Sequence, residues 1–179
     1  GAALVPAILR GLALCALLTL AGLLVFDSYF FRSEVAPSST LTSWLSVSAT
    51  VLLTLHLLAW LRHVSPEQSI DSAFISAALT RSVGATEAVR LGFAVLSTLA
   101  LTLARRPRVA LLFALGAVLV GGGIGHPAAI HPLIAIPAKS LHLMAVALWL
   151  GGLVWLAASF KRGASVAGAS TVSTVALAA

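Results

Sequence analysis

Long stretches without a single formal charge constrain this sequence more than any other feature. Residues 109–138 contain no Asp, Glu, Lys or Arg, and His142 is the one ionisable residue between positions 140 and 160. A helix needs about 20 mostly apolar residues to cross the hydrocarbon core of a bilayer. Both stretches are long enough, so we expect the chain to fold in a membrane rather than around a water-soluble core.

The composition of the whole chain agrees with this expectation. Hydrophobic residues make up 60% and charged residues 9% of its 179 positions, and the mean hydropathy is +1.07. Soluble domains carry about 25% charged residues, so the polar side chains here are too few to cover a water-facing surface. The net charge of +6 comes from basic residues at the ends of apolar runs, where they contact lipid headgroups. The expected partner is therefore the lipid bilayer and not nucleic acid.

The apolar runs predict an all-α fold, a polytopic transmembrane helical bundle that forms one domain over residues 1–179. The five expected spans cover about residues 4–26, 34–62, 85–104, 109–125 and 137–160. In the connection at residues 63–84, apolar side chains recur at roughly helical spacing, which predicts a short helix on the membrane surface. The uncharged segment 163–179 predicts the beginning of a further span that is cut short, with a disordered tail of small residues as the alternative.

The positions of Lys and Arg predict the orientation of the bundle. The short Arg105–Arg108 connection carries three arginines, and short cytoplasmic loops are enriched in basic residues. We therefore expect this loop in the cytoplasm and the N-terminus outside. His63, His126 and His131 are then expected on the outer side as well.

Histidines near the outer end of the expected spans are the candidate site residues. His142 lies five residues into the last expected span, and His56 lies six residues before Arg62. At a rise of 1.5 Å per residue, the two are about 8 and 9 Å below the outer surface. His126 closes the fourth expected span at that surface. Ionisable groups are costly in hydrocarbon, so these three histidines are expected to form a metal site if their helices are neighbours, with the participation of His56 left open.

Three other side chains near this site are further candidates for metal binding: His131, Met144 and Cys15. His131 is expected at the entrance to the site, and Met144 would supply a soft sulfur ligand for Cu(I). Met144 is two residues from His142, about 200° around a helix, whereas Trp149 is seven residues away and shares the face of His142. Cys15 lies at a comparable depth, but lone cysteines mostly behave as small hydrophobic residues.

One run of residues carries a family resemblance. Gly125-His126 is followed by the segment from His142 to Leu153, with Trp149 and Gly151-Gly152 inside it. This arrangement resembles the "GH … HLxAxxxWxGGL" pattern of the copper resistance D family (CopD/PcoD-like) of bacterial inner-membrane proteins. The resemblance implies copper ion transport or handling across the cytoplasmic membrane, in copper uptake or resistance. It also implies a copper ion as cargo and an extracytoplasmic copper-binding domain or protein as partner. By the same resemblance, the chain is expected to lack the family's last spans.

Two other functions stay open at this point. A b-type haem electron carrier would use His56 and His142 as axial ligands of one iron, and an assembly subunit would use its histidines for packing alone. No catalysis is expected, because the spans contain no paired carboxylates and the chain shows no Ser-His-Asp pattern. Glu87 and Arg90, three residues apart, are interpreted as a local ion pair, with an anion-facing or gating role as the alternative.

Overall fold

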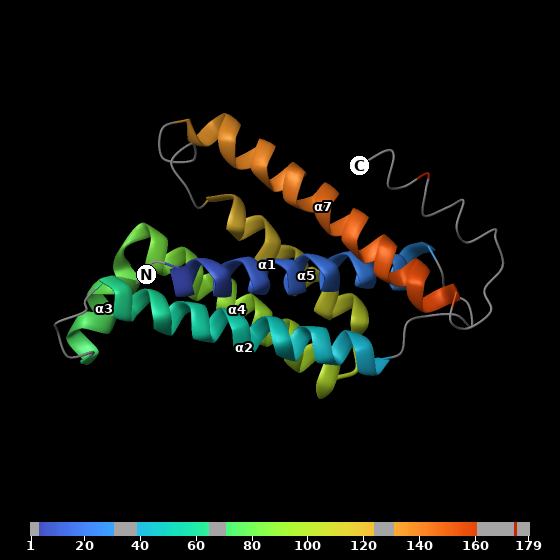
Figure 1. The fold of residues 1–179 in the computed structure, drawn as a ribbon, viewed down its shortest axis with the longest axis horizontal. Coiled ribbons are helices and arrows are strands. Elements are labelled where there is room, and N and C mark those ends of the chain that lie inside the picture. The colour runs from blue at the N-terminus through green and yellow to red at the C-terminus, as the bar shows by residue number, and fades with distance from the viewer. Residues whose placement is uncertain (1–3, 31–38, 65–70, 124–130, 161–173, 175–179) are drawn as a thin grey trace.

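The described part of the chain is entirely helical. The computed structural model describes residues 4–30, 39–64, 71–123, 131–160 and 174, and it contains no strand within them. This confirms the all-α fold class. The elements, shown in Figure 1, are α1 (Leu4–Val25), the π-helical turn η1 (Phe26–Phe30), α2 (Ser39–Val64), α3 (Ser72–Thr80), α4 (Ser82–Thr102), α5 (Pro107–Val120), the 3₁₀ turn η2 (Gly121–Gly123) and α7 (Pro132–Phe160).

Four helical segments are long and apolar enough to cross a membrane. They cover Leu4–Tyr29, Ser39–Val64, Val83–Thr102 and Pro132–Ala158. The remaining expected span corresponds to the apolar segment Pro107–Gly123, which is shorter than these four. Its expected last residues, 124 and 125, lie outside the described residues. By length and composition, the described helices are compatible with a multi-pass membrane protein.

Helix α1 forms the centre of the bundle. It packs against α2, α5 and α7, while α4 lies against α2 and α5. Figure 1 shows α1 between α7 on one side and α2 on the other. The second half of α1 is buried almost all round, including Leu17, Leu20, Ala21 and Leu24. Large apolar side chains are instead exposed on the outer helices, as lipid-facing surfaces require.

The helices alternate in direction, so the bundle has two distinct ends. At one end, which we call the His56 end, the ring of His56 on α2 contacts the backbone of Pro6 on α1. At the other, the Arg105 end, the rings of Phe26 and Trp155 stack with centroids 6.4 Å apart. This arrangement places the arginines of the α4–α5 connection and the histidine-bearing ends of α2 and α7 on opposite sides of the bundle.

Helix α7 begins earlier than expected. The sequence predicts its start near Pro137, but the helix starts at Pro132 and continues through Pro137. Proline is favoured at the first helical position because its missing N–H has no helical partner there. The His131 carbonyl accepts hydrogen bonds from the N–H groups of Ile134 and Ala135. His142 consequently lies ten residues into the helix rather than five.

The short helix expected between the second and third spans is present as α3. The Asp71 carboxylate caps its first turn by accepting a hydrogen bond of 2.8 Å from the Phe74 N–H. Its last turn lies against the start of α4, where a Cβ on Gly84 would collide with the Ala78 carbonyl. This close contact fixes the beginning of α4, the helix that carries Glu87 and Arg90.

The contact between α1 and α7 depends on a pair of glycines. A Cβ on Gly151 would collide with the backbone of Gly22, and a Cβ on Gly22 would collide with the Ala147 carbonyl. Between helices in lipid, close van der Waals packing at small residues replaces the hydrophobic effect. Gly22 and Gly151 therefore form the point of closest backbone approach between α1 and α7 that these contacts indicate.

Substitution Gly22→Ala is expected to separate α1 from α7 and to destabilise the bundle. Overpacking of a well-packed interior costs about 1–3 kcal/mol, and here the methyl group meets backbone rather than a flexible side chain. The measurement is thermal unfolding of the purified chain in detergent micelles. The control is Gly11→Ala on the same helix, where a Cβ has no atom within 4 Å. Equal melting temperatures for the two variants would contradict the close contact.

Candidate functional site

A buried network of ionisable side chains lies at the His56 end of the bundle. The residues Glu87, Arg90 and His56 are only 4%, 1% and 5% exposed. The Glu87 Oε1 atom lies 3.6 Å from Nε2 of His56 and 3.9 Å from Nε of Arg10. The Glu87 Oε2 atom lies 3.6 Å from Nη1 of Arg90. One carboxylate therefore contacts side chains from three helices.

Local helical geometry and helix packing both contribute to this network. Glu87 and Arg90 are three residues apart on α4, so they share one face of that helix. The other contacts cross between helices: His56 comes from α2 and Arg10 from α1. The second ring nitrogen of His56, Nδ1, lies 3.0 Å from the Pro6 carbonyl oxygen. An isolated carboxylate would be costly in an apolar bundle, and these cationic and imidazole groups offset that cost.

Two further elements border the network. Lys139 on α7 is close enough to interact electrostatically with Arg10, Arg90 and Glu87. A Cβ on Gly121 of η2 would lie 3.7 Å from Cζ of Arg90 and 3.7 Å from Leu143 of α7. The network thus lies where α1, α2, α4, η2 and α7 meet, at one end of the bundle.

The histidines singled out from the sequence lie in different surroundings. His56 is buried in the network, whereas His142 on α7 and His131, just before α7, are exposed. The neighbour of His142, Leu143, is buried near Gly121, so His142 lies at the His56 end. His126 falls outside the described residues.

The spacing argument about α7 agrees with the structure. His142 and Trp149 are both exposed, as residues on a shared face should be. Met144 is half-buried and packs against the central apolar cluster. Met144 therefore contributes to packing on the core side of α7, away from the face of His142. Cys15 is exposed on α1.

A complete metal site is not formed by the part of the chain that the structure describes. Within it, no group of three or more His, Cys, Asp or Glu side chains is placed to hold a metal ion. Both ring nitrogens of His56 already face protein groups, Glu87 and the Pro6 carbonyl. A metal at His56 would have to displace one of these contacts. A site that combines His126 and His142 stays a prediction.

From the sequence, Glu87 and Arg90 are predicted as a local pair on one helix, and their contacts with other helices are not predicted. A usable signal was present, because Arg10 and Lys139 each interrupt an apolar run near the same end as His56. Depth along the spans was applied to the histidines and Cys15 but not to the charged residues. Applied to every ionisable residue, the same reasoning would have brought these groups to one level of the membrane.

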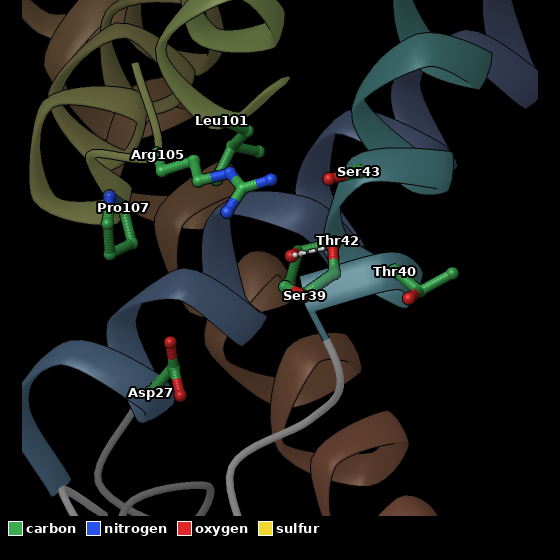
Figure 2. A pocket seen from close by; sticks show the side chains of 8 residues that line it. All are labelled: Asp27, Ser39, Thr40, Thr42, Ser43, Leu101, Arg105 and Pro107. Carbon is green, nitrogen blue, oxygen red and sulfur yellow. Dashed lines mark hydrogen bonds between the residues drawn. The ribbon is translucent and has the colours of Figure 1, made fainter. Parts of the chain in front are cut away.

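A second polar feature lies at the Arg105 end. A pocket of about 720 Å³ is lined by η1, the start of α2, the end of α4 and the α4–α5 connection. Its lining residues are Asp27, Ser39, Thr40, Thr42, Ser43, Leu101, Arg105 and Pro107. Figure 2 shows the Arg105 guanidinium extending toward the hydroxyl groups of α2, with Asp27 on another wall. Arg105 has a positive φ of 50°, which turns the chain between α4 and α5. No residue of this pocket was singled out from the sequence for a functional role.

Comparison of the chain with protein-family models, with curated proteins and with solved structures finds no match. Its function must therefore follow from its own residues. The groups best suited to bind a ligand are the ion network around Glu87 and the exposed histidines near it. Such a set can hold cations through imidazole and carboxylate and anions through guanidinium.

Substitution Glu87→Gln is expected to destabilise the protein strongly. It keeps the side-chain size but leaves Arg90 buried without a carboxylate, and breaking a buried ion pair costs about 3–5 kcal/mol. The control is Arg10→Gln, because Arg10 is 41% exposed and ion pairs at the surface contribute less than about 1 kcal/mol. Thermal unfolding in detergent micelles measures both variants. A Glu87→Gln effect as small as that of Arg10→Gln would contradict the central role of this carboxylate.

Proposed function

We propose that this chain transports or handles copper ions across a bacterial cytoplasmic membrane, with the His56 end and the N-terminus on the outer face. The proposal has two supports. One is the buried ionisable network inside an apolar bundle, and the other is the group of histidines at the same end. The family resemblance of the segment from His142 to Leu153 connects these histidines to copper.

The buried network is the observation that carries a transport function. Side chains of Arg10, His56, Glu87 and Arg90 come from three helices to one level of the bundle. Ionisable groups inside a membrane are costly, and they commonly line substrate or ion pathways. A subunit whose helices only pack together would not need this arrangement, so the network favours transport over a purely structural role.

Copper is the cargo that best suits the candidate ligands. Neutral imidazole binds copper well, and His142 has an exposed ring ten residues into α7, in the half of the bundle where copper would arrive. In the proposed sequence of events, His131 captures the ion, His126 and His142 hold it, and His56 lies next along the path. Met144 packs on the core side of α7 and would be used only after the ion moves inward. An extracytoplasmic copper-binding domain or protein would deliver the ion.

The haem alternative receives no support from the surroundings of His56. An axial ligand must direct one ring nitrogen at the iron. Here Nδ1 of His56 faces the Pro6 carbonyl and Nε2 faces Glu87. No specific observation favours a haem carrier, and copper handling is therefore the one function that we propose. Nothing in the proposal requires an enzymatic step.

Substitution His142→Ala in cells that produce the full chain is expected to change copper accumulation several-fold, because it removes the accessible imidazole at the outer end. Cellular copper is measured by mass spectrometry and normalised to the amount of protein in the membrane. The matched control is Leu141→Ala, which alters the adjacent exposed residue and removes no metal ligand. We expect this control to accumulate copper like the wild type.

Unchanged accumulation in the His142→Ala variant, at normal protein level, would reject the proposed function. The absorption spectrum of the purified chain adds an independent check. A strong Soret band that disappears in the His142→Ala variant would assign the histidine to haem instead of copper.

A further inference from the structure

Part of the buried Arg90 side chain is left without a partner in the described residues. Its Nη1 atom faces Glu87 at 3.6 Å, but its Nε and Nη2 atoms are buried and make no hydrogen bond there. The Glu87 Oε2 atom also lacks a hydrogen bond, so the contact between the two residues is Coulombic. Buried polar groups without partners are rare and costly. An acceptor beside Nε and Nη2 of Arg90 would remove this cost.

The two unpartnered nitrogens lie on the same edge of the guanidinium plane. In arginine, the Nε–H bond and one N–H bond of Nη2 point in parallel from that edge. This fork matches two oxygens of one carboxylate or phosphate group, and such paired hydrogen bonds are among the strongest in proteins. The geometry of the unsatisfied donors therefore indicates an oxyanion rather than a halide ion or a neutral ligand.

The charge balance of the network also favours an anion. Arg10 and Arg90 are two basic residues that lie within 4 Å of a single carboxylate, Glu87. Two positive charges against one negative charge leave an excess of one positive charge in these contacts. Uncompensated charge is costly at the edge of a low-dielectric bundle. A phosphate group, which carries one or two negative charges, would compensate the excess better than a neutral molecule.

Small residues border this part of Arg90. At Gly121, a Cβ would make ordinary van der Waals contact with Arg90, 3.7 Å from Cζ and 3.8 Å from Nε, so this glycine lies next to the guanidinium. The next residue, Gly122, lies against the hydroxyl group of Ser140 on α7. Ser140 follows Lys139 directly, so a hydroxyl donor and an ammonium group lie on the helix that faces this glycine turn.

The depth of the network matches the level of lipid phosphates. Helix α7 has 29 residues, about 43 Å at 1.5 Å per residue, which equals the thickness of a bilayer with its headgroups. Lys139 lies seven residues from the start of α7, about 10 Å along the axis. Lys and Arg side chains extend toward the interface from such positions. A lipid headgroup and a dissolved phosphate can both reach this level.

We propose that Arg90, together with Arg10 and Lys139, binds a phosphate group, either free or in a lipid headgroup, at the His56 end of the bundle. Arg90 contributes its Nε and Nη2 fork, and the other two residues contribute positive charge. The site uses none of the histidines that we assign to copper. A negative result for phosphate binding would therefore leave the copper proposal unaffected, and a negative result for copper would leave the phosphate site unaffected.

The test uses the full chain with two probes, in detergent micelles for the first and in nanodiscs for the second. The first probe is inorganic phosphate, compared with chloride at equal ionic strength, and the second is phosphatidylglycerol added to phosphatidylcholine nanodiscs. Thermal unfolding is followed as a function of each probe, and at least one of them is expected to raise the melting temperature. Stabilisation by phosphate identifies a free anion as the ligand, and stabilisation by phosphatidylglycerol alone identifies a headgroup.

Variants at the edge of the network make the test specific. Arg10→Gln and Lys139→Gln are each expected to weaken the apparent affinity by about tenfold, the effect of losing one interaction with a charged group. An Arg90→Gln variant would leave Glu87 buried without its cation and could fail to fold, so these two substitutions replace it. The matched control is Arg62→Gln, an exposed arginine at the same end, which should bind like the wild type.

Two results would overturn the phosphate site. One is the absence of stabilisation by either probe in the wild-type chain. The other is equal stabilisation of the wild type, Arg10→Gln and Lys139→Gln, because binding would then not involve these cations. A loss in Arg62→Gln as large as in the other two variants would likewise overturn it, since the effect would reflect net charge alone.

Discussion

A carboxylate inside an apolar bundle needs positive charge or hydrogen-bond donors beside it, and the His56 end is built around this requirement. Glu87 lies within 4 Å of Arg90 on its own helix, His56 on α2 and Arg10 on α1. These contacts hold the same ends of α1, α2 and α4 together. They also bring more positive than negative charge to one place, so the interactions that organise this end give it the capacity to bind an anion.

Helix packing places the remaining groups around that carboxylate. The close contact of Gly22 with Gly151 keeps α7 against α1, and the glycine turn η2 lets α7 approach Arg90. Lys139 reaches the network because of this approach, and His142 stays on the outer face of the same helix. The two proposed activities therefore depend on one scaffold but on different side chains: imidazoles for copper and guanidinium and ammonium groups for phosphate.

The sequence predicted the helical spans well because uncharged runs of this length have few alternatives to a membrane helix. The predicted start of α7, near Pro137, was too late. Proline is compatible both with the end of a helix and with its first residue, and Pro132 is the first residue of α7. The pair Glu87 and Arg90 was found from its spacing along one helix. Its contacts with His56 and Arg10 depend on which helices are neighbours, and periodicity within a helix does not contain that information.

The most direct test of this account is a double-mutant cycle on His56 and Glu87, measured by unfolding in detergent micelles. These residues lie on different helices, so an interaction between them cannot come from spacing on one helix. The variants are His56→Gln, Glu87→Gln and the combination of both. A coupling free energy of at least about 1 kcal/mol is expected, as for side chains in one buried network. Additive effects, within about 0.5 kcal/mol, would show that the Glu87 carboxylate does not join α2 to α4.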